Sequence, residues 1–281
     1  MFSTLFSTLF RNSDGELRNG WWIALFFLLL AAGVFPLIML SSSLGFELAP
    51  WMQALLVLLV SLLCQRLRGK PQAQLLGALN RQWLRQLAAG VLLGAVLMAL
   101  PALLLTLTGQ LSWQWHGLGQ TALLAALLLF VGVAVTEELT FRGFMFQRLI
   151  DGIGSWPAQL VMSAYFVLNH ASALKQGDSW HYLAMLNIFI ASLMFGLAYL
   201  RTRSLALPIG LHFMANFTQG TLLGFGVSGS AEQGMLSPVI AAGCPDWLSG
   251  GSFGLEASIP GLITVILFTV LLWRWRGSAA A

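Results

Sequence analysis

The sequence predicts an all-α polytopic membrane protein with about eight transmembrane helices and with both termini in the cytoplasm. Two observations predict this class. Of the 281 residues, 58% are hydrophobic and only 9% are charged, whereas soluble proteins carry roughly 25% charged residues. The apolar residues also fall into runs long enough to cross a hydrocarbon layer of about 30 Å. We therefore expect an integral membrane protein, with membrane lipids as neighbours.

The composition also excludes several kinds of partner and site. The chain has 14 Lys and Arg against 10 Asp and Glu, and no basic run that could follow a phosphate backbone, so we expect no nucleic-acid partner. The two cysteines, Cys64 and Cys244, lie far apart and lack the CxxC spacing of a thiolate metal site.

Residues 1–120 are predicted to contain three spans, at residues 21–40, 48–64 and 87–107. The first begins with Trp21 and Trp22, whose amphipathic rings suit the membrane interface. The second is shorter and leads into a basic loop. In the third, Gly90-xxx-Gly94 would allow another helix to approach closely. These spans and the basic cytoplasmic loop form the predicted N-terminal region.

Residues 121–226 are predicted to form the core, which holds the polar residues of interest. The predicted spans are residues 123–150, 157–173, 182–200 and 205–225. Polar residues interrupt the first two of these. Pro208 suits a helix N-terminus at the start of the fourth, and Gly220-xxx-Gly224 is a second candidate for close packing.

Residues 227–281 are predicted to form an external loop and the last span. The stretch 227–258 contains no Lys or Arg and is rich in Gly and Ser, and the apolar run at 259–275 follows it. We interpret the stretch as a loop because it has neither the apolar length of a span nor the basic residues of a cytoplasmic segment.

Thirteen of the 14 basic residues fall on one side of this map. Cytoplasmic loops of membrane proteins carry an excess of Lys and Arg, so this split favours the assigned topology. One misplaced span would move every charge beyond it to the other side. The cytoplasmic set is Arg11, Arg18, Arg66, Arg68, Lys70, Arg81, Arg85, Arg142, Arg148, Arg201, Arg203, Arg274 and Arg276, and only Lys175 falls outside.

The acidic residues divide unequally between loops and spans. Glu137 and Glu138 fall inside the span 123–150, where a charge costs roughly 2.5–3.5 kcal/mol on insertion scales. Intramembrane charges of this kind favour a functional interpretation. The other eight are assigned to loops and chain ends, and they are Asp14, Glu16, Glu47, Asp151, Asp178, Glu232, Asp246 and Glu256.

The spacing predicts different roles for the two adjacent glutamates. Glu138 and Arg142 are separated by four residues, so on a helix they form an ion pair. Glu137 points about 100° away from Glu138 and cannot share that pair. We therefore expect a structural Glu138–Arg142 pair, and a Glu137 carboxylate that is free to act as a base.

Three further polar residues are predicted to lie at the depth of Glu137. His170 falls in the span 157–173, and His212 and Asn216 are i,i+4 neighbours in the span 205–225. Counting 1.5 Å per residue from the cytoplasmic ends gives depths of about 16 Å for Glu137, 20 Å for His170, 12 Å for His212 and 18 Å for Asn216. All four should therefore meet near the middle of the bilayer.

This set of side chains fits hydrolysis without a covalent intermediate. Glu137 and His170 would activate a water, while His212 and Asn216 would donate hydrogen bonds to the developing oxyanion. A zinc-dependent version is the alternative, in which Glu137, His170 and His212 bind the metal and Glu138 is the base. The HExxH motif of many zinc proteases is absent from the sequence, so we expect no cofactor, with zinc as the alternative.

The three motifs resemble the signature of the CPBP (ABI) intramembrane proteases, which include the type II CAAX prenyl endopeptidase. The matching residues are Glu137-Glu138-xxx-Arg142, Phe166-xxx-His170 and His212-xxx-Asn216. The resemblance covers residues 121–226. It implies an eight-helix fold with the site inside the membrane and a glutamate-dependent, metal-free endopeptidase, although members are often labelled metalloendopeptidases.

The resemblance leaves the substrate open, because members of the family cleave different substrates. We expect a peptide or membrane-protein substrate, with or without an attached lipid. Two other functions remain as alternatives. One is a transporter, because intramembrane carboxylates and histidines also form proton relays; the other is a non-catalytic bacteriocin-immunity membrane protein.

Overall fold

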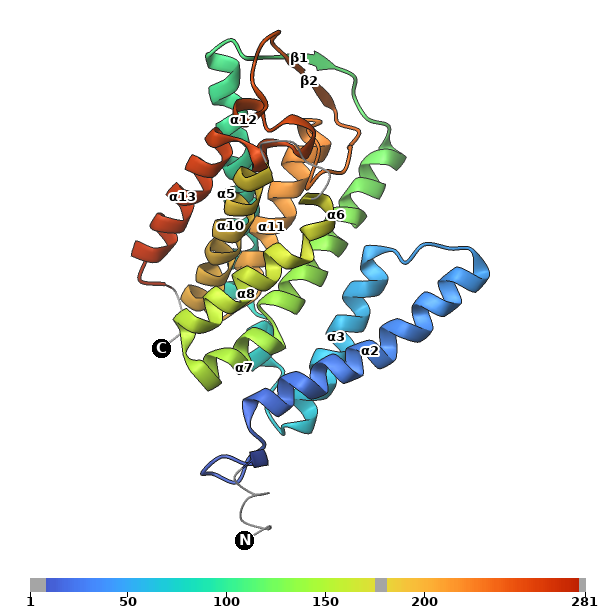
Figure 1. The fold of residues 1–281 in the computed structure, drawn as a ribbon, viewed down its shortest axis with the longest axis vertical. Coiled ribbons are helices and arrows are strands. Elements are labelled where there is room, and N and C mark those ends of the chain that lie inside the picture. The colour runs from blue at the N-terminus through green and yellow to red at the C-terminus, as the bar shows by residue number, and fades with distance from the viewer. Residues whose placement is uncertain (1–8, 175–180, 278–281) are drawn as a thin grey trace.

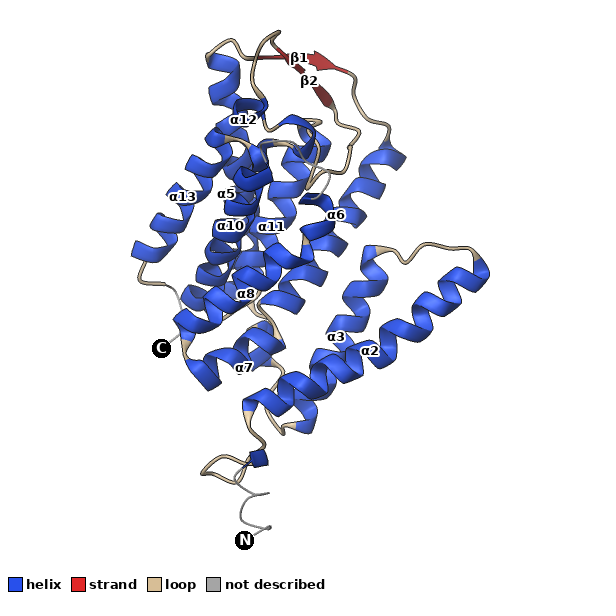
Figure 2. Ribbon diagram, in the orientation of Figure 1, coloured by secondary structure: helices blue, strands red, loops and turns tan. Residues whose placement is uncertain are grey.

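The computed structural model describes residues 9–174 and 181–277, and it shows a bundle of long helices with one small two-stranded sheet (Figure 2). The all-α class predicted from the sequence is confirmed. Lys175, the one basic residue predicted on the external side, lies outside the described residues.

Helices account for most of the described chain. They are α2 (Asn19–Leu44), α3 (Pro50–Leu67), α4 (Ala73–Leu76), α5 (Arg81–Leu107), α6 (Gln120–Phe141), α7 (Phe144–Ile153), α8 (Ser155–Asn169), α9 (Ala171–Leu174), α10 (His181–Thr202), α11 (Ala206–Phe217), α12 (Asp246–Ser249) and α13 (Ile259–Arg274). A π-helical turn η1 (Thr218–Leu222) continues α11, and two short 3-10 turns, η2 (Gly251–Phe253) and η3 (Leu255–Ala257), precede α13.

Five helical segments of the described chain are long and apolar enough to cross a membrane. They are Asn19–Leu44, Pro50–Leu67, Ala73–Leu107, Gln120–Ile153 and His181–Thr202, and the apolar helix α13 is shorter. Each of the eight predicted spans contains a helix. The number of crossings and the cytoplasmic placement of the termini stay predictions, because α8 and α11 have only 15 and 12 residues.

The predicted span 123–150 is wrong as a single helix. α6 ends at Phe141, and α7 begins at Phe144 after a break at Arg142 and Gly143. Gly143 packs so closely on the Leu139 carbonyl that a side chain at this position would collide with it. The depth of Glu137, which was counted along one straight helix from Arg148, therefore does not apply.

Two other predicted spans also end earlier than the apolar pattern indicates. α8 ends at Asn169, so His170 caps the helix instead of lying within it. The regular part of α11 ends at Phe217, and the π-helical turn follows. The C-cap His170 of α8 lines a cavity, and Asn216, next to the last regular residue of α11, lines the same cavity.

The tightest helix contact joins α5 to α11. A Cβ atom at Gly90 or Gly94 would collide with backbone carbonyls of α11, and one at Gly210 would collide with the Leu87 carbonyl of α5. The close packing predicted for Gly90-xxx-Gly94 is confirmed. The close helix packing predicted for Gly220-xxx-Gly224 is wrong, because Gly224 lies beyond the helix, at a φ of 70°.

The helices form a main bundle with a separate hairpin beside it (Figure 1). α2 and α3 make the hairpin, with α3 against α6 and α2 against α7. β1 (Leu111–Trp115) and β2 (Leu236–Ile240) pair antiparallel, with Trp113 opposite Pro238, at the end of the bundle away from α7. This pairing ties the loop after α5 to the loop that precedes α13.

Candidate active site

Six helices, the loop between η1 and β2, and the turn η3 surround a cavity of about 320 Å³. Glu137 of α6, His170 at the end of α8, and His212 and Asn216 of α11 all line it. The structure therefore brings the four residues proposed from the sequence to one cavity, although their chemical roles stay predictions. The rest of the wall is largely apolar and includes Leu97, Met98, Leu129, Phe130 and Val133.

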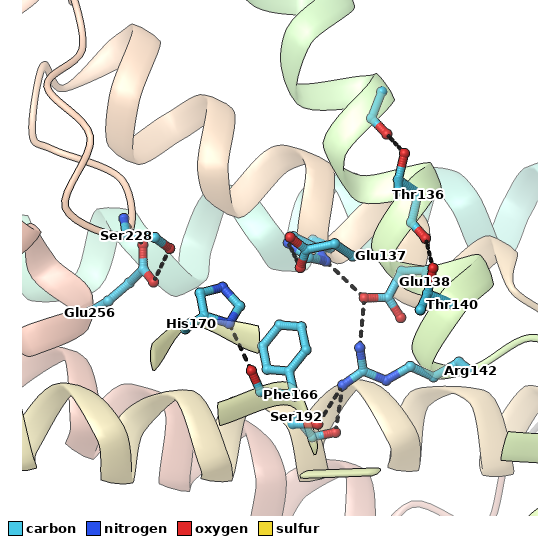
Figure 3. A network of polar contacts seen from close by, with 12 residues as sticks. Thr136, Glu137, Glu138, Thr140, Arg142, Phe166, His170, Ser192, Ser228 and Glu256 are labelled. Carbon is cyan, nitrogen blue, oxygen red and sulfur yellow. Dashed lines mark hydrogen bonds and ion pairs between the residues drawn. The ribbon is translucent and has the colours of Figure 1, made fainter. Parts of the chain in front are cut away.

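Glu138 and Arg142 form the ion pair that their spacing predicts (Figure 3). The Arg142 guanidinium donates to Glu138 Oε1 at 3.0 Å and to the Ser192 carbonyl and hydroxyl oxygens at 2.9 and 2.8 Å. Both side chains are almost fully buried, with 1% and 0% exposure. The rings of Phe166 and Phe195 each lie 5.1 Å from the guanidinium carbon. The buried cation is thus paired, hydrogen-bonded and covered by aromatic faces.

His212 lies between the two adjacent glutamates. Its Nδ1 is 2.7 Å from Glu138 Oε1, and its Nε2 is 3.7 Å from Glu137 Oε2. A carboxylate paired with arginine can only accept, so Nδ1 carries the proton and donates to Glu138. The Phe195 ring stacks on the imidazole at 4.8 Å. The sequence predicts His212 beside Asn216, but it does not reveal that Glu138 orients this ring.

Glu137 is the carboxylate that remains free. Its Oε2 atom is buried and accepts no hydrogen bond from the residues that the structure describes. His212 Nε2 is 3.7 Å from this oxygen and thus beyond hydrogen-bond distance. Because about 20% of the side chain is exposed to the cavity, this carboxylate can take up a proton there.

The backbone of α8 fixes the orientation of His170. The ring Nδ1 lies 2.8 Å from the Phe166 carbonyl oxygen, which can only accept, so Nδ1 donates (Figure 3). In the neutral ring the proton is therefore on Nδ1, and the lone pair of Nε2 is available. The Phe166 side chain packs on the imidazole, with ring centroids 4.6 Å apart.

The structure adds two acidic residues to the cavity that sequence reasoning assigned to an ordinary loop. Glu232 and Glu256 both line it. Burial raises the pKa of the Glu232 carboxyl. Burial also raises the pKa of the Glu256 carboxyl, against the opposing effects of His170 and of hydrogen bonds from Gln219 and Ser228. The sequence carries no signal for either residue, because both lie in a Gly- and Ser-rich stretch outside the motifs.

The side chains as placed do not form the alternative zinc site. In residues 9–174 and 181–277, no three His, Cys, Asp or Glu side chains make a group that could hold a metal ion. Because His212 Nδ1 bonds to Glu138, only its Nε2 could bind a metal. As placed, the predicted zinc triad of Glu137, His170 and His212 is not gathered around one point, and the zinc-dependent version stays the alternative.

Comparison with known proteins supports the resemblance found in the motifs. Residues 119–218 match the family model described as type II CAAX prenyl endopeptidase, Rce1-like. The match spans α6 to α11 and includes all three motifs. No curated protein and no solved structure matches the chain. With its apolar helices, this match supports an integral membrane protein with the general character of a CAAX-type intramembrane protease.

Proposed function

We propose that this protein is an intramembrane endopeptidase in which Glu137 and His170 activate a water for attack on a peptide bond. One observation carries the proposal. Of the two adjacent glutamates, the buried Glu138 bonds to Arg142 and His212, whereas the partly exposed Glu137 has no hydrogen bond and lines a cavity together with His170. A proton acceptor beside a second basic group is what general-base hydrolysis requires.

The attack uses both residues. The water donates one hydrogen bond to Glu137 and the other to the free Nε2 of His170, which directs an oxygen lone pair at the scissile carbonyl. As the oxygen–carbon bond forms, one proton passes to Glu137 and the carbonyl becomes an oxyanion. Glu137 then gives this proton to the nitrogen of the leaving amine, and the carbon–nitrogen bond breaks.

The oxyanion is stabilised from α11. Asn216 lines the cavity one turn beyond His212 and has an amide that can donate. His212 already donates through Nδ1, so its Nε2 donates only when the ring is an imidazolium. Carboxylates on both sides, Glu138 at 2.7 Å and Glu137 at 3.7 Å, favour that charged form. Together these donors would form an oxyanion hole.

The cavity wall indicates the class of substrate. Apolar side chains from α5 and α6 line it together with the polar groups. This arrangement suits a segment of a membrane protein or an amphipathic peptide, whose apolar side chains would contact the wall. The substrate need carry no lipid for this fit.

The test is a comparison of membrane-protein termini in strains that produce the wild type or Glu137→Gln. The variant keeps the volume and removes the base, so we expect termini that are present only in the wild type. A normal level of folded variant is the control. If the termini were unchanged but the flux of a solute changed, the protein would instead be a transporter. If the termini were unchanged and the variant still protected cells from a bacteriocin, it would be a non-catalytic immunity protein.

Purified protein tests whether the step is metal-free. We expect cleavage of the identified substrate to survive exhaustive chelation. Inactivation by chelator that stoichiometric zinc reverses would contradict this part of the proposal and leave the role of Glu137 to be reassigned.

A further inference from the structure

Glu256 lies in the active-site cavity although it belongs to neither the three motifs nor the matched region. It is in η3, more than 80 residues after His170 in the chain. In Figure 3 the His170 ring lies between the Glu256 carboxylate and the Phe166 carbonyl. Glu256 and His170 are close enough to interact electrostatically, and both line the cavity.

The hydrogen bonds to Glu256 favour its ionised form and oppose the effect of burial. Gln219 Nε2 donates to Oε1 at 2.8 Å, the Ser228 backbone N–H donates to the same oxygen at 3.2 Å, and the Ser228 hydroxyl lies 3.1 Å from Oε2. A carboxylate can accept all three hydrogen bonds. In a protonated carboxyl, one oxygen would carry a hydrogen and would face the N–H or O–H group of Gln219 or Ser228. Gln219 is fixed in turn by a bond to the Gly226 carbonyl at 2.7 Å.

We propose that Glu256 is the charge partner of His170: it stabilises the imidazolium that forms when His170 takes the second proton of the attacking water. This inference rests on the proposed function. After attack, the oxygen from the water still carries one proton and donates it to Nε2. When the carbon–nitrogen bond has broken, this proton passes to Nε2, so the products are a carboxylate, an amine and a protonated His170 that returns its proton to solvent.

Two features of the fold favour a positive charge at this ring. The Phe166 carbonyl belongs to the last turn of α8, so His170 lies at the negative end of the helix dipole, and Nδ1 already donates to that end. Glu256 faces the ring from the loop side (Figure 3), and in its ionised form it adds a negative charge there. The external loop therefore completes the site by supplying a positioning residue.

The test is Glu256→Gln, assayed on the substrate identified through Glu137. Without the charge we expect kcat to fall about tenfold or more, which is a modest part of general acid–base catalysis, while KM stays the same. Glu256→Asp should restore part of kcat, because it keeps the charge. Asp246→Asn is the control: it removes a charge from an exposed position in the same loop and should leave both constants unchanged.

Ser228→Ala separates charge from loop anchoring. It removes the hydroxyl but keeps the carboxylate and the backbone N–H contact, so we expect nearly normal kcat. If Glu256 served only to hold the loop, Glu256→Gln and Ser228→Ala would lower both activity and thermal stability together. That result, or a fully active Glu256→Gln variant, would overturn the inference. The proposed protease function would still be supported by the loss of activity in Glu137→Gln.

Discussion

At the residue scale, the central feature is that two adjacent glutamates have different partners. Arg142 is four residues after Glu138 and five after Glu137, and this spacing was enough to predict that Glu138 forms the ion pair, which the structure shows at 3.0 Å. His212 adds a second bond to the same oxygen of Glu138. Glu138 therefore links α6 to α11, and the free carboxylate of Glu137 depends on this link.

We predict that Arg142→Met unfolds at a lower temperature than the wild type and is inactive. Removing one partner of a buried pair leaves the other charge uncompensated, at a cost of about 3–5 kcal/mol. Glu138→Gln/Arg142→Met should recover part of that loss, because it removes both charges. Thermal unfolding in detergent measures each variant, and a single variant as stable as the wild type would show that the pair contributes nothing.

Other residue contacts could not be predicted, for a physical reason. The Phe166 carbonyl that orients His170 is a backbone group, and a motif of side chains does not show where a helix ends. Glu256 reaches the cavity because η3 folds back over the bundle, next to Ser228. Neither contact leaves a periodic pattern in the sequence, so only the folded chain reveals them.

At the element scale, the packing of α5 against α11 holds His212 and Asn216 in place. Gly90-xxx-Gly94 was visible in the sequence, but its partner Gly210 stands outside any motif. The ends of α6 and α8 were not predictable, because the apolar runs continue past them. A run of apolar residues shows that a segment is surrounded by lipid or by protein. It does not show where the helix breaks, because a break depends on local backbone contacts such as that of Gly143 with Leu139.

We predict that Gly94→Ala lowers both stability and activity. Alanine ordinarily stabilises a helix relative to glycine by roughly 0.5–1 kcal/mol. Here its methyl group would collide with the Leu211 carbonyl, and relieving such overpacking costs about 1–3 kcal/mol. Gly94→Ala should therefore destabilise the protein instead of stabilising it, and α11 should move away from the cavity. Thermal unfolding and kcat are the measurements.

Gly20→Ala is the matched control for this prediction. Gly20 lies in the first turn of α2, and a Cβ atom there has nothing within 4 Å. This variant should be as stable as the wild type or slightly more stable. If both alanine variants behaved alike, close packing between α5 and α11 would not be what Gly94 provides.

At the scale of the whole molecule, most of the basic residues lie towards one end, and the loop side of the cavity lies towards the other. The Leu205 backbone N–H, just after α10, donates to the carbonyl of Leu76 at the end of α4. The Arg201 side chain, in α10, donates to the Leu272 carbonyl in the last turn of α13. Arg201 in the last turn of α10 and Arg274 at the end of α13 lie at this end, whereas β1, β2 and α12 lie at the other end of the bundle (Figure 1). The predicted charge asymmetry thus has a counterpart in the fold, and the positive-inside rule would place the loop side of the cavity outside the cytoplasm.

The two native cysteines test this orientation. Cys64 is 0% exposed, while Cys244 is half-buried in the loop between β2 and α12. We predict that a membrane-impermeant maleimide labels Cys244 in intact spheroplasts and that Cys244→Ser abolishes the labelling. Burial, together with the charge of Asp246, raises the pKa of the Cys244 thiol. Because the thiolate is the reactive form, labelling should accelerate about tenfold per pH unit between pH 7 and 8.

Arg276→Cys in the Cys244→Ser background gives the opposite readout from the same assay. Arg276 is exposed just after α13, at the end of the molecule where the arginines gather, so a cysteine there should react only after the membrane is permeabilised. If the two labelling patterns were exchanged, the protein would sit the other way up. The loop that carries Glu256 would then face the cytoplasm, and substrates would reach the cavity from that side.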